Sequence, residues 1–122
     1  MLDLELMTRS GCPIAVTLDL VGDKWSLVIV RDMLIGKRRY GQFLTSPEGI
    51  TTNILADRLK RMEEYGLVSK QPYQERPLRY EYALTPTGVS LLPVLQAMCR
   101  WGNRNIPDTW TPPESFMKRR VR

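Results

Sequence analysis

Polar side chains that can recognise another molecule recur at helical spacing between positions 51 and 61 of the chain. At about 100° per residue, an amide, a hydroxyl and two cations point away from an apolar stripe. Such a face suits the major groove of DNA, because the groove admits one helix and an amide can bind adenine through two hydrogen bonds. The alternative is an ordinary solvent-exposed helix. The side chains predicted to contact base edges are Thr52, Asn53 and Ala56.

Cations near the same stretch predict the phosphate contacts, which give affinity and register without sequence information. Residues 37–61 carry six cations against Glu48 and Asp57, and residues 114–122 carry four cations against one anion, within a chain of net charge +5. A local excess of this kind is typical of a surface that binds a polyanion, although an ordinary solvated surface can have the same composition. The predicted phosphate contacts are Lys37, Arg38, Arg39, Thr51, Lys60 and Arg61.

Two charged residues of this stretch have competing interpretations. Arg58 lies beside the apolar stripe, so it suits an ion pair within the fold as well as it suits DNA. Asp57 faces outward and would repel phosphate, unless it accepts a hydrogen bond from cytosine or orients a neighbouring cation. The sequence leaves both questions open.

Residues suited to catalysis or metal binding are scarce. The chain has no histidine, which removes Ser-His-Asp and Cys-His pairs together with the commonest zinc ligand. Cys12 and Cys99 lack CxxC spacing, and the glycines do not form a phosphate-binding loop. Acid chemistry needs only a pair of carboxylates, but nothing in the sequence marks one. We therefore predict that the protein is not an enzyme and has no catalytic residue, no metal and no cofactor.

Length and composition predict one soluble domain. The chain has 122 residues, of which 43% are hydrophobic and 25% charged, as in ordinary globular proteins. No apolar run approaches the roughly 18 to 20 residues that span a bilayer. Residues 1–7 are acidic, unlike the start of a secretory signal. We expect a cytoplasmic protein with no membrane partner.

Helix signals position the polar face. Thr51 can cap the start of a helix, Gly66 can end it, and Leu55, Leu59 and Met62 form its buried stripe. Upstream, proline and glycine residues separate shorter helical patterns. A short helix, a turn at 46–49 and the polar helix together make a helix-turn-helix. The upstream helices are predicted over 13–21 (stopped by Gly22), over 24–35 (capped by Asp23) and over 40–44.

A hairpin follows the polar helix. Alternating apolar and polar residues predict strands over 67–73 and 79–84, joined by a tip at 74–78. A hairpin in this position is a wing, in which Arg76 and Arg79 would reach the DNA backbone or the adjacent minor groove. A charged hairpin tip can also be simply solvated.

The last long helix is predicted over 85–103, with a bend at Pro93, which removes one backbone hydrogen bond. Its apolar stripe belongs either to the core or to a dimer seam, and a domain this small favours the seam. The predicted dimer-interface residues are Ile14, Leu18, Leu91, Leu95, Met98 and Gly102. The predicted segments are a flexible arm at 1–11, a domain at 12–106 and an extended basic tail at 107–122.

This order of elements is a winged helix-turn-helix, mainly α with a small β-hairpin (α+β), and its motifs resemble the HxlR-type bacterial transcriptional regulators, relatives of the MarR class. The match covers roughly residues 12–102 in the family's own order. Asp23 departs from it, because the family usually has Gly or another small residue there. The matching motifs are Cys12-Pro13, 18–25, 39–43, 49–51, Leu55, Arg58-Leu59, Glu63, 66–68, 79–82, Leu84-Thr85, Gly88 and Trp101-Gly102.

The resemblance implies a homodimer that binds double-stranded DNA at an inverted repeat and dimerises through its N- and C-terminal helices. Some members sense electrophiles or oxidants through the cysteine matching Cys12, whose place at a helix start favours a thiolate. The alternative for Cys12 is a small half-buried residue. A small-molecule effector could bind near Trp25 and Trp101, although aromatic residues are more often core. The other function that the sequence allows is a protein-interaction module without specific DNA binding.

Overall fold

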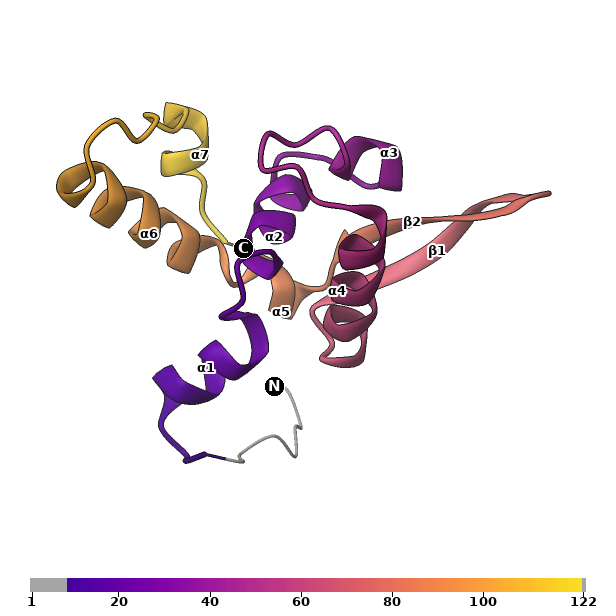
Figure 1. Cartoon of the computed structure of the whole chain (residues 1–122), viewed down its shortest axis with the longest axis horizontal. Coiled ribbons are helices and arrows are strands. Elements are labelled where there is room, and N and C mark those ends of the chain that lie inside the picture. The colour runs from indigo at the N-terminus through magenta and orange to yellow at the C-terminus, as the bar shows by residue number, and fades with distance from the viewer. Residues whose placement is uncertain (1–8, 122) are drawn as a thin grey trace.

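The structure, a computed structural model, describes residues 9–121, so most of the predicted arm at 1–11 lies outside the described residues. The chain forms a group of helices and one two-stranded antiparallel hairpin (Figure 1). This confirms the predicted helix-rich fold with a β-hairpin wing. In chain order the elements are α1 (Pro13–Val21), α2 (Ser26–Leu34), α3 (Tyr40–Phe43), α4 (Thr52–Glu64), β1 (Val68–Glu75), β2 (Leu78–Leu84), α5 (Pro86–Val89), α6 (Leu92–Asn105) and α7 (Glu114–Lys118).

The core collects apolar side chains from α2, α3, α4, the base of the hairpin and α6. Val30 of α2, Leu55 of α4 and Leu92 of α6 are completely buried. Each such burial stabilises the fold by roughly 1.5–3 kcal/mol relative to exposure. Helix α2 is buried on several sides, as its apolar sequence predicts, but it begins at Ser26 because residues 24 and 25 form a turn.

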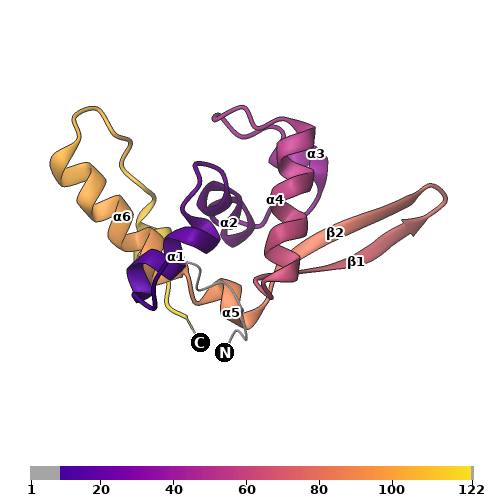
Figure 2. The same ribbon diagram turned by 60° about the horizontal axis from the view of Figure 1, so that its bottom comes forward.

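The wing joins the core only at its base. Val68 pairs with Leu84 and Glu75 with Leu78, so the strands extend slightly beyond their predicted ends. From the base the hairpin projects away from the helices (Figure 2). The backbone N–H of Tyr82 donates to the carbonyl of Arg38 at 2.8 Å, which ties the loop between α2 and α3 to the wing.

The prediction of one bent helix over 85–103 was wrong, because the structure has two helices there. Thr85 caps α5 by accepting a hydrogen bond from the N–H of Gly88, and Pro93 lies in the first turn of α6, where its missing N–H costs no helical bond. Gly88 is required at this corner: a Cβ there would lie 2.2 Å from the carbonyl oxygen of Leu67.

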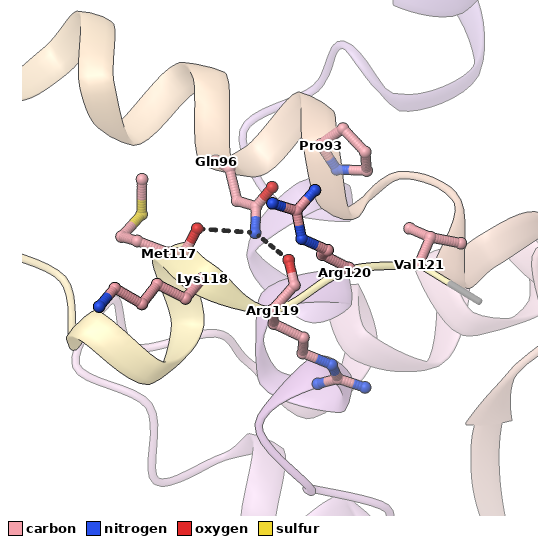
Figure 3. A pocket seen from close by; sticks show the side chains of 7 residues that line it. All are labelled: Pro93, Gln96, Met117, Lys118, Arg119, Arg120 and Val121. Atoms are coloured by element: carbon pink, nitrogen blue, oxygen red, sulfur yellow. Dashed lines mark hydrogen bonds between the residues drawn. The ribbon is translucent and has the colours of Figure 1, made fainter.

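The tail predicted to be extended over 107–122 contains the short helix α7 and packs on the fold. The side-chain amide of Gln96 is buried and donates to the carbonyls of Phe116 at 3.0 Å, Met117 at 3.3 Å and Arg119 at 2.7 Å (Figure 3). The guanidinium of Arg119 donates to the carbonyl of Leu34 at the end of α2. The C-terminal segment therefore joins α6 to α2.

Helix α1 extends away from the other helices in the view of Figure 1. Ile14 is 72% exposed and Leu18 55% exposed, and Val21 is the residue of α1 that is buried. An apolar face of this size is unusual on a helix that meets only water. None of the described helices has the length and apolar character to cross a membrane.

Candidate nucleic-acid interface

Helix α4 presents one buried and one exposed face, as predicted. The hydroxyl of Thr51 accepts a hydrogen bond from the N–H of Ile54 at 3.4 Å, and Gly66 takes the positive φ of 79° that ends the helix. Leu55, Leu59 and Met62 are buried against the core. The predicted base-contacting residues, Thr52, Asn53 and Ala56, are all exposed; Asn53 lies opposite the buried stripe, and Thr52 and Ala56 lie on its flank.

An ion pair within the fold positions α4 from its flank. The Nε atom of Arg58 lies 2.8 Å from Oδ2 of Asp23, in the turn before α2. The same carboxylate accepts hydrogen bonds from the backbone N–H groups of Trp25 and Ser26 and from the Ser26 hydroxyl. The structural interpretation of Arg58 is therefore confirmed, and Asp23 has a second role besides capping.

Asp57 orients cations on the exposed side of α4. Its carboxylate lies 3.2 Å from Nε of Arg61 and also contacts Arg58. Arg61 therefore shares its charge with a neighbouring anion, whereas Lys60 forms no salt bridge with any residue that the structure describes. Of the two cations predicted on this helix, Lys60 has the charge most available to a phosphate.

A polar network that the sequence analysis missed positions the turn before α4. Asp32 is 2% exposed, and it accepts hydrogen bonds from Ser46 and, at 2.8 Å, from Nη2 of Arg31. Arg31 in turn donates to both carboxylate oxygens of Glu48, at 2.8 and 2.9 Å. The signal for this network was the charged Arg31-Asp32 pair inside an otherwise apolar helix, since a buried charge needs partners.

The three cations of the basic loop at 37–39 have different environments, and some of them are paired within the fold. Lys37 donates to the Ser46 hydroxyl at 2.7 Å, so its ammonium group belongs to the buried network rather than to a free cationic cluster. Arg39 stacks over the ring of Tyr73, 3.6 Å from its centroid, and lies 3.7 Å from Glu81. Arg38 is exposed. The predicted cluster is therefore partly neutralised within the fold.

The polar face of α4 has neighbouring elements that carry exposed cations. Helix α4 lies beside α3 and beside the base of the wing (Figures 1 and 2). Arg76 and Arg79 are exposed at the far end of the hairpin. The arrangement offers one helix face for base edges, and neighbouring elements carry exposed cations that suit a phosphate backbone.

The predicted sensor and effector positions lie elsewhere. Cys12 is an exposed free thiol immediately before α1, and Cys99 is a partly buried free thiol on α6. Trp25 packs against the core, whereas Trp101 is 64% exposed on α6. Neither tryptophan lines the large apolar groove that the structure contains, which lies between α2, α6 and the C-terminal segment.

Comparisons with known proteins agree with this geometry. A family model described as HxlR-like helix-turn-helix matches residues 20–109. An HTH-type transcriptional regulator of Synechocystis sp., sll1512, is 40% identical over 75% of this chain and 68% of its own length. The oxidised form of the redox regulator HypR has a TM-score of 0.69 at 35% identity, covering 77% of this chain and 97% of that one. The reduced transcriptional regulator YodB from B. subtilis has a TM-score of 0.67 at 28% identity, covering 81% and 98%.

The contact between Asp23 and α4 predicts an acid-sensitive contribution to stability. Burial alone would raise the pKa of Asp23, but hydrogen bonds from Ser26, Arg58 and the backbone outweigh it and lower the pKa to about 2. Because the folded pKa lies below the unfolded value of about 3.9, the contribution is complete above pH 4 and is lost as pH falls through 2. A depression of this size corresponds to about 2 kcal/mol.

Chemical denaturation of the Asp23→Asn variant between pH 2 and pH 5 measures this contribution. We expect the variant to be less stable than the wild type at pH 5 and to approach it at pH 2. Asp108→Asn, at an exposed carboxylate, is the matched control and should follow the wild type throughout. A parallel pH dependence in wild type and Asp23→Asn would contradict this role of Asp23.

Proposed function

The chain belongs to the HxlR-like helix-turn-helix family of transcriptional regulators, and from this premise we propose that it acts as a homodimer on an inverted-repeat operator. The observation that carries the proposal is the exposed polar face of α4, which is fixed on its buried side by Leu55 and Leu59 and on its flank by Asp23. A helix held so firmly is suited to direct readout, because base contacts require a fixed position in the groove. Such a regulator works in the cytoplasm, where the chromosome lies.

Each part of the surface has its own task in this proposal. Asn53 binds adenine, with Thr52 and Ala56 beside it against neighbouring base edges. Lys60, Arg61, Arg38, Arg39 and the N-terminal Thr51 contact phosphates, and Lys37 supports them from within the fold. Arg76 and Arg79 of the wing contact the DNA backbone or the adjacent minor groove.

The dimer seam is formed by α1 and α6. Ile14 and Leu18 on α1 and Met98 on α6 are exposed apolar side chains, whereas Leu91 and Gly102 are half-buried. Leu95 differs from the rest of the predicted set: it is 6% exposed within the protomer and packs in its core. Two protomers joined in this way would place their α4 helices in successive major grooves, about 34 Å apart.

The DNA-binding proposal is tested by fluorescence anisotropy on the duplex upstream of the gene and on a shuffled duplex, across a salt series. We expect selective binding with a steep negative salt slope, because phosphate contacts release counterions. Asn53→Ala should lose roughly 1–3 kcal/mol of discrimination at one base pair. Lys60→Ala should weaken both duplexes alike and reduce the magnitude of the salt slope by about one.

The two variants control for one another, since both lie on the exposed face of α4 and neither is buried. An unaltered sequence preference in Asn53→Ala would show that this residue does not read a base. Absence of binding by the wild type even at low salt would favour a protein-interaction module and contradict the proposed function.

The dimer proposal predicts that a charge on α1 separates the protomers. Leu18→Glu should shift the protein from dimer to monomer in sedimentation experiments, because an unpaired carboxylate cannot be buried in an apolar seam. Leu78→Glu is the matched control, since Leu78 is equally exposed, at 56%, but lies on the wing. A Leu18→Glu variant that remains dimeric would place the seam on another surface.

We further propose that Cys12 makes DNA binding sensitive to oxidants or electrophiles. The thiol is exposed at the start of α1, so a change of its chemistry would act on the proposed seam. The structural neighbours HypR and YodB are named for redox forms, which supports a redox role without identifying the thiol here.

A Cys12→Ser variant tests the sensor. Treatment with a mild peroxide should change the DNA affinity of the wild type and leave that of Cys12→Ser unchanged, because serine cannot form a sulfenic acid or disulfide. Cys99→Ser is the matched control and should respond as the wild type does. An equal response in wild type and Cys12→Ser would exclude Cys12 as the sensor.

A further inference from the structure

An apolar groove of about 730 Å³ lies between α2, α6 and the C-terminal segment, away from the residues assigned to DNA. Its walls include Leu27 of α2, Met98 of α6 and Phe116 of α7, and Trp110 lies at its edge with 78% of its surface exposed. Both the volume and the apolar lining are those of sites that bind small molecules. The C-terminal segment that forms one wall is fixed by the Gln96 amide, so the groove belongs to the folded structure.

The charges that line this groove are all positive. Arg31 and Arg119 are its charged lining residues, and no carboxylate lines it among the residues that the structure describes. Arg119 donates through Nη1 to the carbonyl of Leu34 and forms no salt bridge with a described residue. Its side chain leaves the segment on the side away from Gln96 (Figure 3). Among the described residues, the Arg119 guanidinium therefore has an unpaired charge and several free hydrogen-bond donors beside an apolar groove.

We propose that this groove binds a small aromatic anion, with the ring between α2 and α6 and the anionic group at Arg119. The apolar walls supply the affinity for a ring, because burial of apolar surface favours binding. Arg119 supplies the preference for a carboxylate or sulfonate, because hydrogen bonds between charged groups are stronger than neutral ones. The same groove offers a cationic ligand no charged partner among its lining residues.

Arg31 connects the groove to the DNA-binding surface. It lines the groove and also holds both carboxylate oxygens of Glu48, in the turn that precedes α4. Attraction of the Arg31 guanidinium toward an anion held at Arg119 in the same groove weakens its hold on Glu48 and so loosens the turn. We therefore expect the ligand to weaken DNA binding, a step that rests on the proposed function, whereas the binding site itself does not.

The competing occupant is a second copy of the chain. Met98 lies both in the groove and on the proposed dimer seam, so α1 of a partner could cover part of the groove. The cationic lining favours an anionic small molecule over the apolar side chains Ile14 and Leu18 of that helix. A titration of the intact dimer distinguishes these occupants.

The probe is 8-anilinonaphthalene-1-sulfonate, and its uncharged analogue N-phenyl-1-naphthylamine reports the groove without the charge. We expect saturable binding of the sulfonate to the full-length protein. Arg119→Gln should weaken it roughly tenfold, the loss expected for one charge-assisted hydrogen bond, and should leave the uncharged analogue unaffected. Arg119→Lys, which keeps the charge, should retain most of the affinity, and Arg120→Gln, at the neighbouring residue that does not line the groove, is the matched control.

Ser115→Trp tests the location independently of Arg119, because Ser115 lines the groove and a large side chain there should exclude both dyes. Circular dichroism confirms that each variant is folded. Failure of the folded dimer to bind either dye would overturn the proposal and assign the groove to the partner protomer. Equal sulfonate binding by wild type and Arg119→Gln would overturn the role of the anion.

The link to DNA is measured in the anisotropy assay at saturating sulfonate. We expect wild-type affinity to fall about threefold or more, within the usual range of coupling between two sites. Arg119→Gln, which is only partly occupied at the same dye concentration, should show a smaller fall. An unchanged wild-type affinity for DNA would overturn the link between the groove and DNA binding, but not the ligand site itself. A protein that binds the dye but no DNA at any salt would contradict the proposed function and leave the groove assignment standing.

Discussion

The need to pair the buried carboxylate of Asp32 determines how the recognition surface is held. A carboxylate that is 2% exposed is strongly unfavourable unless charged and hydrogen-bonding groups compensate it. Arg31 and Ser46 provide this compensation, and Arg31 then also binds Glu48. Satisfying one buried charge in α2 therefore fixes the turn that starts α4. Helix α4 therefore begins where an internal electrostatic requirement places it.

Pairing within the fold also explains why the cations near α4 differ in how much positive charge they leave unpaired. Lys37 and Arg58 have partners within the fold, and Arg61 shares Asp57 with Arg58, so a count of positive residues overstates the free charge. Lys60 forms no salt bridge with a described residue, and Arg38 is exposed. Different members of one basic cluster therefore stabilise the fold and remain available for the proposed phosphate contacts.

The sequence predicted the elements that depend on local patterns and missed those that depend on distant partners. The Thr51 cap, the buried stripe at Leu55 and Leu59 and the hairpin follow from spacing and turn chemistry, and the structure confirms them. The break between α5 and α6 was missed because Pro93 was assigned to a helix interior rather than to a helix start. The ordered tail was missed because composition suggests a basic tail, whereas Gln96, about twenty residues earlier, supplies its partners. No local pattern contains that information.

Helix α2 is where these requirements meet. Its Asp32 and Arg31 support the turn before α4, its last carbonyl at Leu34 accepts a hydrogen bond from Arg119, and its apolar side chains form one wall of the groove. A rigid helix with contacts at both its faces and its end transmits a displacement better than a loop does, because packed elements have few alternative arrangements. The C-terminal segment and the turn before α4 are far apart in sequence, yet α2 contacts both. The C-terminal segment and the turn before α4 are therefore both anchored on this one helix.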